Sequence, residues 1–344
     1  MREAVLLVGG QGTRLRPLTL TTPKPLLPVA GVPFLTHQLA GLRRAGIGHV
    51  VLATSYQADV FTRVFGDGSE LGLRITYLTE DQPLGTGGAI RHAASGLASE
   101  GDAPIVILNG DVLSGHDLSG QVEFHESSRA DVTLHLVEVE DARAYGCVPT
   151  DDEGRVTAFL EKMDDPVTRW VNAGAYVFRR SVIDEIPPER VVSVERETFP
   201  GLLAKGRYVY AWKESAYWCD VGTPDALVRC SADIVLGHAP TAAEIRPPGE
   251  AWFADADRPP AGVVVGGGSS VAAGVDIGEG AWIDGSIVMT GAVIGPGAMI
   301  AQSVIGAEAQ IGANARLDHA VVADRGVVAE GAHLATGERV EAAP

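Results

Sequence analysis

A glycine-rich loop near the N-terminus is the first part of the chain whose residue types could do chemistry. It carries three glycines and an arginine, and a lysine follows a little further on. Glycines at the end of a strand let backbone N–H groups approach phosphate oxygens, and two cations would offset the charge of a triphosphate. The residues concerned are Leu7, Val8, Gly9, Gly10, Gly12, Thr13, Arg14 and Lys24. The same glycines would also suit a tight turn, because the spacing matches neither G-x-x-x-x-G-K-[ST] nor G-x-G-x-x-G.

A second glycine-rich segment, Glu80–Ala89, stands between an expected strand and an expected helix. Its glycines, Gly85 and Gly87, could let the backbone face a planar base, and Gln82 could hydrogen-bond to that base. The alternative is an ordinary loop that leads into a helix.

Two aspartates offer ligands for a divalent cation. Asp111 ends the apolar strand Ile105–Leu108, and Asp220 lies in Tyr217–Thr223. Ligands of open α/β sheets bind at the carboxyl ends of strands, and carboxylates together with phosphate oxygens suit octahedral Mg²⁺. An aspartate at a strand end is also a common turn former, and the sequence separation does not establish that the two meet.

An acidic and a basic residue stand side by side at Glu161 and Lys162. Glu161 could accept hydrogen bonds from sugar hydroxyls, and Lys162 could hold a sugar phosphate. Such a pair on its own usually belongs to a solvated face.

The segments that would position these residues alternate between strand and helix patterns, which predicts a mostly parallel sheet covered on both faces. Strands are expected at Val5–Val8, His49–Ala53, Leu73–Leu78, Ile105–Leu108, Asp131–Val139, Val156–Leu160 and Ala173–Phe178, and helices at Leu35–Ala45, Ala58–Phe65 and Ala89–Leu97.

The composition changes after residue 237. Residues 238–261 are rich in proline and predict a linker between a catalytic domain, 1–237, and a C-terminal domain, 262–344. Six-residue units that begin with an aliphatic residue and glycine then recur, as in Ile294–Met299 and Ile311–Arg316. This period predicts a left-handed parallel β-helix, whose pattern weakens near Leu317–Val328. Such a domain favours stacking or homo-oligomerisation.

The composition restricts the partners. The formal net charge is −17, from 44 acidic and 27 basic residues, which argues against nucleic acid. No apolar run is long enough to span a bilayer, and the N-terminal apolar stretch is too short for a signal peptide. We therefore expect no membrane partner and a cytoplasmic location. The three cysteines, Cys147, Cys219 and Cys230, indicate neither a disulfide framework nor a zinc site.

Gly-Gly-x-Gly-Thr-Arg-Leu with a downstream Pro-Lys-Pro resembles the sugar-phosphate nucleotidyltransferases, or nucleotide-sugar pyrophosphorylases, and the likeness continues into the hexapeptide tail. It implies the Rossmann-like nucleotide-diphospho-sugar transferase fold followed by the β-helix. It also implies that the segment around Gly85 lines the base pocket, that Gly146, Glu161 and Asn172 contact the sugar, and that Asp111 and Asp220 bind Mg²⁺. Arg14, Lys24 and Lys162 would then be the catalytic cations.

Three segments resemble the bacterial mannose-1-phosphate guanylyltransferases within this family: Phe34–His37, Ser193–Pro200 and Ala216–Thr223. This resemblance implies GTP and mannose 1-phosphate as substrates, with GDP-mannose and pyrophosphate as products. Glucose-1-phosphate enzymes that use another nucleotide share most of these residues, and a sugar-like cyclitol phosphate is a further alternative.

Two alternatives come from other classes of protein. Hexapeptide β-helices often belong to acyltransferases, which need a catalytic histidine, and His319 and His333 lie in the repeats. An inactive regulatory subunit is the second alternative. It is disfavoured because the four expected residues are all present: Arg14, Lys24, Asp111 and Lys162.

Overall fold

The computed structural model describes residues 1–54, 58–160, 162–255 and 259–342. The chain packs into two compact units, one formed by Met1–Gly10 and Leu39–Trp218 and the other by Gln11–Gln38 and Cys219–Pro344. The second unit therefore includes a segment near the N-terminus and helix α7 (Pro224–Val235), both of which the sequence assigned to the catalytic domain.

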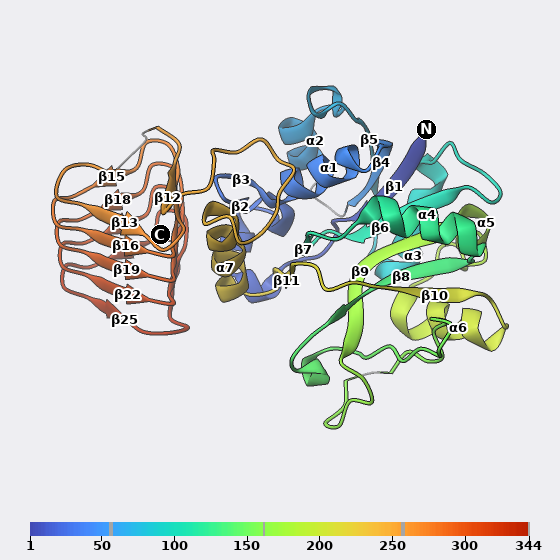
Figure 1. Ribbon diagram of the computed structural model, residues 1–344. Helices are drawn as coiled ribbons and strands as arrows, with labels where there is room; N and C mark the ends of the chain where they lie inside the picture. Colours follow the sequence, from blue (N-terminus) through green and yellow to red (C-terminus); the bar gives the residue numbers. More distant parts are fainter. Residues whose placement is uncertain (55–57, 161, 256–258, 343–344) are drawn as a thin grey trace. The chain divides into compact units, whose positions relative to one another are not determined.

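A seven-stranded sheet forms the centre of the first unit, with the strand order β10-β8-β9-β6-β1-β4-β5 (Figure 1). Its strands are β1 (Arg2–Leu7), β4 (Ile47–Thr54), β5 (Arg74–Thr79), β6 (Pro104–Asn109), β8 (Val132–Glu138), β9 (Trp170–Arg179) and β10 (Val209–Lys213). Strand β9 runs antiparallel to β8 and β6, and the other neighbouring pairs are parallel. The sheet is thus mostly parallel, as predicted.

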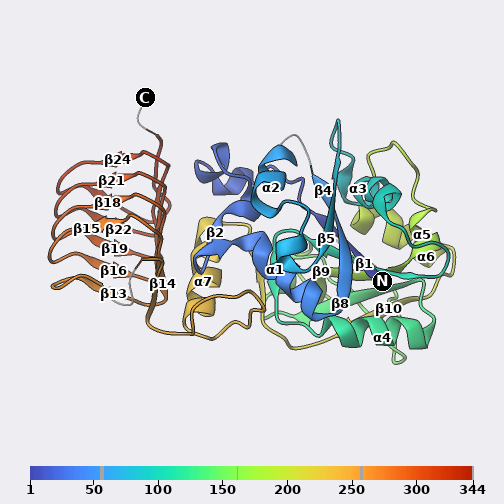
Figure 2. The same ribbon diagram turned by 90° about the horizontal axis from the view of Figure 1, so that it is seen from above.

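Helices cover both faces of this sheet (Figure 2). Side chains alternate between the two faces along β8. Leu134 belongs to the core that contains residues of helix α3 (Gly85–Ala93). The hydroxyl of the preceding residue, Thr133, is instead 2.9 Å from the Nδ1 atom of His125, in helix α4 (Leu118–Ser128). The other helices are α1 (Phe34–Arg44), α2 (Ala58–Phe65), α5 (Arg180–Ile183) and α6 (Phe199–Ala204).

Two expectations for the first unit were wrong. Val156–Leu160 forms no strand, because only its end residues make isolated bridges, Val156 with Thr150 and Leu160 with Cys147. Helix α3 begins at Gly85 rather than at Ala89. Val192 explains the early start: its N–H donates to the Leu84 carbonyl oxygen, and its own carbonyl oxygen accepts from the N–H of Gly87.

The C-terminal region of the second unit is a parallel β-helix with three sheets, consistent with the left-handed form that the repeats predicted. The sheets have the strand orders β12-β14-β17-β20-β23-β26, β13-β16-β19-β22-β25 and β15-β18-β21-β24 (Figure 1). The strands are β12 (Ala251–Phe253), β13 (Val264–Gly266), β14 (Ser269–Val271), β15 (Asp276–Ile277), β16 (Trp282–Asp284), β17 (Ile287–Val288), β18 (Val293–Ile294), β19 (Met299–Ala301), β20 (Val304–Ile305), β21 (Gln310–Ile311), β22 (Arg316–Asp318), β23 (Val321–Val322), β24 (Val327–Val328), β25 (His333–Leu334) and β26 (Arg339–Val340).

Stacked aliphatic side chains fill the interior of this β-helix. Ile283, Ile300 and Leu317 occupy matching positions in paired strands and are at most 2 % exposed. The structure corrects one expectation here, the linker. The segment assigned as a linker already contributes a strand, β12, that pairs with β14. The coils continue through the weak repeats to β26, within the expected bounds of the domain.

Four short strands and two short helical turns complete the elements used below. The strands are β2 (Pro28–Val29), β3 (Val32–Pro33), β7 (Val112–Ser114) and β11 (Trp218–Asp220), and the turns are η1 (Thr13–Leu15) and η7 (Val194–Thr198). No helix within the described ranges combines the length and the apolar character needed to cross a membrane.

Candidate active site

The glycine-rich loop is divided between the two units. Its first part, Leu7–Gly10, belongs to the first unit, and Gly12, Arg14 and Lys24 belong to the second. Gly12 has a φ of 59°, a left-handed conformation that glycine adopts without strain. A Cβ atom on Gly12 would lie 3.1 Å from the Cβ atom of Lys24. Because Gly12 has no side chain, Lys24 packs directly against the loop. This brings a cation next to the glycines that would face the phosphates.

The guanidinium group of Arg14 lies directly against the backbone of Gly222. A Cβ atom on Gly222 would stand 2.6 Å from an Nη atom of Arg14, closer than such atoms approach in proteins. Gly222 follows Asp220, which is half-buried at the end of strand β11. The second unit thus brings together Gly12, Arg14, Lys24 and the Asp220–Thr223 segment.

Asp111 lies beside the first part of the loop within the first unit. The N–H of its neighbour Gly110 donates to the Leu7 carbonyl oxygen at 3.0 Å, and a Cβ atom on Gly110 would stand 2.8 Å from a methyl carbon of Val8. Strands β6 and β1 are parallel neighbours, so their carboxyl ends emerge at one edge of the sheet. Asp111 therefore directly follows a residue that packs against Leu7 and Val8.

Gly85 and Gly87 are packed against the chain itself. A Cβ atom on Gly85 would lie 2.6 Å from the carbonyl oxygen of Val192, and one on Gly87 would lie 2.9 Å from a methyl carbon of the same residue. The structure thus gives both glycines a packing reason, and their role in base binding stays a prediction. Gln82 is exposed on the loop before α3 and lines a cavity of about 560 Å³.

Three segments assigned to the sugar lie next to one another in the first unit. Cys147, which follows Gly146, forms bridges with both Leu160 and Val171. A Cβ atom on Gly146 would stand 2.9 Å from the Leu160 carbonyl oxygen, so a larger residue would disturb this junction. Asn172 directly follows Val171 in β9, and its amide nitrogen donates to the Tyr176 hydroxyl at 2.8 Å. Lys162 is exposed, and Glu161 lies outside the described residues.

Thr86 and Glu195 were not among the predicted site residues, yet they support this part of the first unit. The Thr86 hydroxyl donates to Glu195 at 2.8 Å and accepts from the N–H of Val194 at 2.9 Å. These bonds tie the first turn of α3 to η7, two segments far apart in the chain. A threonine directly after a glycine at a helix start was the available signal.

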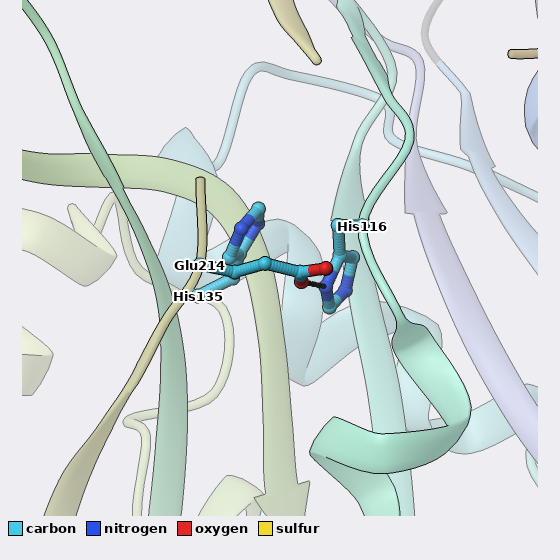
Figure 3. A group of neighbouring side chains, drawn as sticks. All are labelled: His116, His135 and Glu214. Carbon is cyan, nitrogen blue, oxygen red and sulfur yellow. Dashed lines mark hydrogen bonds and ion pairs between the residues drawn. The ribbon is translucent and has the colours of Figure 1, made fainter. Parts of the chain in front are cut away.

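A separate group of potential metal ligands consists of His116, His135 and Glu214 (Figure 3). The two imidazole rings are stacked, with centroids 4.0 Å apart and planes 13° from parallel. The lone pair of an imidazole nitrogen lies in its ring plane, and nearly parallel planes do not meet at one ion. The observed arrangement is therefore a stacked histidine pair rather than a formed metal site. Burial lowers the pKa of both histidines, and a hydrogen bond to Glu214 opposes this for His116.

Comparison with known proteins places this geometry in a family. Residues 3–235 match the family described as nucleotidyl transferase, and residues 260–341 match the GMPPB C-terminal domain. The mannose-1-phosphate guanylyltransferase of Mycobacterium tuberculosis is 54 % identical over 83 % of this chain and 79 % of its own length. The mannose-1-phosphate guanyltransferase beta-A of Xenopus laevis is 38 % identical over 64 % of this chain and 61 % of its own length.

Solved structures show the same likeness. The crystal structure of HddC from Yersinia pseudotuberculosis complexed with GMP-PN is 28 % identical and has a TM-score of 0.58, covering 68 % of this chain and all of that one. The family match over residues 3–235 includes every described residue assigned above to the nucleotide or the sugar phosphate. The chain therefore belongs to the nucleotidyl transferase family.

Proposed function

We propose that the chain transfers a guanylyl group from GTP to mannose 1-phosphate, giving GDP-mannose and pyrophosphate. The observation that carries the choice of substrates is the 54 % identity to the mycobacterial mannose-1-phosphate guanylyltransferase over most of both chains. A related structure holds GMP-PN, which supports a guanine nucleotide.

In the proposed reaction an oxygen of the sugar phosphate attacks the α-phosphorus of the nucleotide in line, and pyrophosphate leaves. Both reactants are anions, so the protein's main tasks are to position them and to offset their charge. Lys162 would orient the attacking phosphate. Arg14 would stabilise the departing pyrophosphate, and Lys24 would contact the phosphates of the nucleotide. The close packing of Gly12 on Lys24 and of Arg14 on Gly222 supports a preorganised cradle for the triphosphate.

Asp111 and Asp220 would hold Mg²⁺. Both carboxylates are half-buried beside strand ends, and a pair of carboxylates is a donor set that Mg²⁺ accepts together with water and phosphate oxygens. When bound, the ion would supply positive charge to the nucleotide phosphates.

The remaining site residues would select the base and the sugar. We propose that Leu7, Val8, Gly9, Gly10 and Thr13 complete the nucleotide site and that Gln82 bonds to the base above Gly85 and Gly87. Gly146, Glu161 and Asn172 would form the sugar site. The meeting of the Gly146, Leu160 and Val171 segments supports this assignment.

The test is a matrix of pyrophosphate release with Mg²⁺. GTP, ATP, UTP, CTP and dTTP are each combined with the 1-phosphates of mannose, glucose, N-acetylglucosamine and a heptose, and the nucleotide-sugar is identified by mass spectrometry. We expect the highest kcat/KM for GTP with mannose 1-phosphate. A higher value for another pair overturns the choice of substrates, and no release from any pair overturns the nucleotidyl transfer.

We also propose that the protein is a cytoplasmic homo-oligomer. Val264, Met299, Val293 and Val327 leave apolar side chains exposed on the β-helix, which supports self-association. Light scattering coupled to size-exclusion chromatography tests this, and a monomeric mass at micromolar concentration contradicts it.

A further inference from the structure

The last coils of the β-helix hold the backbone of the loop that carries Arg14. We call residues 11–27 the phosphate loop, and it belongs to the same compact unit as the β-helix. Arg339, in β26, donates from its two terminal nitrogens to the carbonyl oxygens of Arg14 and Arg16, the former at 2.9 Å. The hydroxyl of Thr21 donates to Asp324 at 2.7 Å. Three points of the phosphate loop are therefore fixed by two side chains of the β-helix.

Both side chains come from parts of the β-helix that are hydrogen-bonded to a neighbouring coil. Arg339 pairs in register with Val321 of β23. The second carboxylate oxygen of Asp324 accepts the N–H of Ala307 at 2.9 Å, so its side chain is held by the preceding coil. A guanidinium group presents several donors in a fixed plane, which suits two carbonyl oxygens of one turn.

The phosphate loop contains three short 3₁₀ turns, Thr13–Leu15, Leu18–Leu20 and Lys24–Leu26, and none of them forms a longer helix. Each turn is three residues long, and short 3₁₀ turns have few and poorly aligned internal hydrogen bonds. Arg14 is held on two sides, because Arg339 binds its carbonyl oxygen while its guanidinium group lies on Gly222. A fourth hydrogen bond, between His319 and Asp225 at 3.1 Å, ties the β-helix to the first turn of α7, directly after the Gly222 segment.

We infer that the β-helix takes part in catalysis by positioning the phosphate loop, with Arg339 and Asp324 as positioning residues that act through Arg14 and Lys24. This goes beyond a stacking or oligomerising role for the domain, and it rests on the proposed function. The positions of the phosphate-binding cations then depend on the integrity of the terminal coils.

The first test is a double-mutant cycle in the full chain. We expect Arg339→Ala to lower kcat/KM for GTP about tenfold, since about 1.4 kcal/mol corresponds to a tenfold change. KM for mannose 1-phosphate should stay within twofold. If Arg339 acts through Arg14, Arg14→Ala/Arg339→Ala should be no slower than Arg14→Ala. Full additivity of the two losses would overturn the inference.

Two further variants separate positioning from general stability. Arg316 is an exposed arginine on strand β22, so Arg316→Ala is the matched control, expected to keep kcat/KM within twofold. Arg339→Lys keeps the charge and one donor and should recover part of the loss. An equal loss in Arg316→Ala, or a normal kcat/KM in Arg339→Ala, contradicts positioning by Arg339.

Amide hydrogen exchange tests the inference without any assay of activity, so it stands apart from the proposed function. The amides of residues 11–27 should exchange at least fivefold faster in Arg339→Ala than in the wild type and at the wild-type rate in Arg316→Ala. Unchanged exchange in Arg339→Ala would overturn the inference that Arg339 positions the phosphate loop. An inactive wild type with the expected exchange pattern would instead overturn the proposed function alone.

Discussion

The proposed catalytic cations differ in how the chain holds them. Arg14 is fixed at its backbone by Arg339 and at its guanidinium group by contact with Gly222. Lys162 is exposed on an irregular segment of the first unit. A preorganised donor costs no reorganisation during the reaction, whereas an exposed lysine is ordered by the substrate it binds. Substitutions at the two positions should therefore act in different ways.

Replacing Lys162 with alanine should lower kcat by about 10²–10³-fold, because one charged donor to the attacking phosphate is lost. The midpoint of thermal unfolding should be unchanged, since the side chain is exposed. Steady-state kinetics and a thermal melt measure the two effects. Lys205→Ala, at another exposed lysine, is the control. A kcat within twofold of the wild type would remove Lys162 from the mechanism.

Replacing Gly222 with alanine should displace the guanidinium group of Arg14, since the new Cβ atom would stand 2.6 Å from it. A small misplacement of a catalytic group can cost about 10²-fold, so we expect kcat to fall about 10–100-fold. Gly249→Ala serves as the control, because its nearest neighbouring atom would be 3.9 Å away. Equal kcat values for the two variants would show that Arg14 does not depend on this contact.

The coils of the β-helix require glycine at one position of the repeat, because the coils pack closely there. The glycine at the second position of each unit, such as Gly295 or Gly312, faces the backbone of the next coil. A Cβ atom on Gly312 would stand 2.4 Å from the Glu330 nitrogen. The six-residue repeat predicts the β-helix but not how closely these glycines pack against the next coil. A larger residue is excluded there, because backbone cannot move aside as the end of a side chain can.

Gly312→Ala should therefore lower the free energy of unfolding by about 1–3 kcal/mol, the usual cost of overpacking. Gly266→Ala should cost much less, because its nearest atom would lie 3.9 Å away and its φ is not positive. Urea unfolding followed by circular dichroism measures both changes. The packing argument fails if the two variants unfold at the same urea concentration.

Sequence patterns correctly predicted the elements whose structure depends on residues close to them in the chain. Helix α2 and the strands of the β-helix follow directly from apolar periodicity. The start of α3 was missed because Val192, more than a hundred residues away, supplies the hydrogen bonds that order Gly85 and Gly87. Arg339 was missed for the same reason, since nothing near it in the sequence indicates contact with Arg14.

At the scale of the whole molecule, the packing units do not follow the order of the sequence. The motif that carries Arg14 and Lys24 was expected to form one domain with the strand before it, yet it packs with α7 and the β-helix. A sequence pattern groups a segment with its neighbours along the chain. Packing also depends on contacts with residues far away in the sequence, here residues 219–344. The family and the candidate residues could be read from motifs, and the dependence of one region on another could not.

Two buried histidines, His125 and His135, connect the stability of the first unit to pH. Burial lowers the pKa of His135 to about 2, with a smaller contribution from His116, and that of His125 to about 4, from an ordinary value of 6.5. The folded chain keeps the rings of His135 and His125 neutral at pH 5, while the unfolded chain takes up protons below pH 6.5. The unfolded state then binds more protons, so the free energy of unfolding decreases as the pH falls.

His135 alone should account for a loss of about 2 kcal/mol between pH 8 and pH 5, because each pH unit below 6.5 corresponds to about 1.4 kcal/mol. His135→Leu fills a similar volume without a titrating group, so the difference between the two pH values should shrink by that amount. His333 is exposed, and His333→Leu should leave the difference unchanged. Urea unfolding followed by tryptophan fluorescence at both pH values measures the change. If His135→Leu keeps the full pH dependence, protonation of His135 does not cause the loss of stability at low pH. The loss must then arise from other groups.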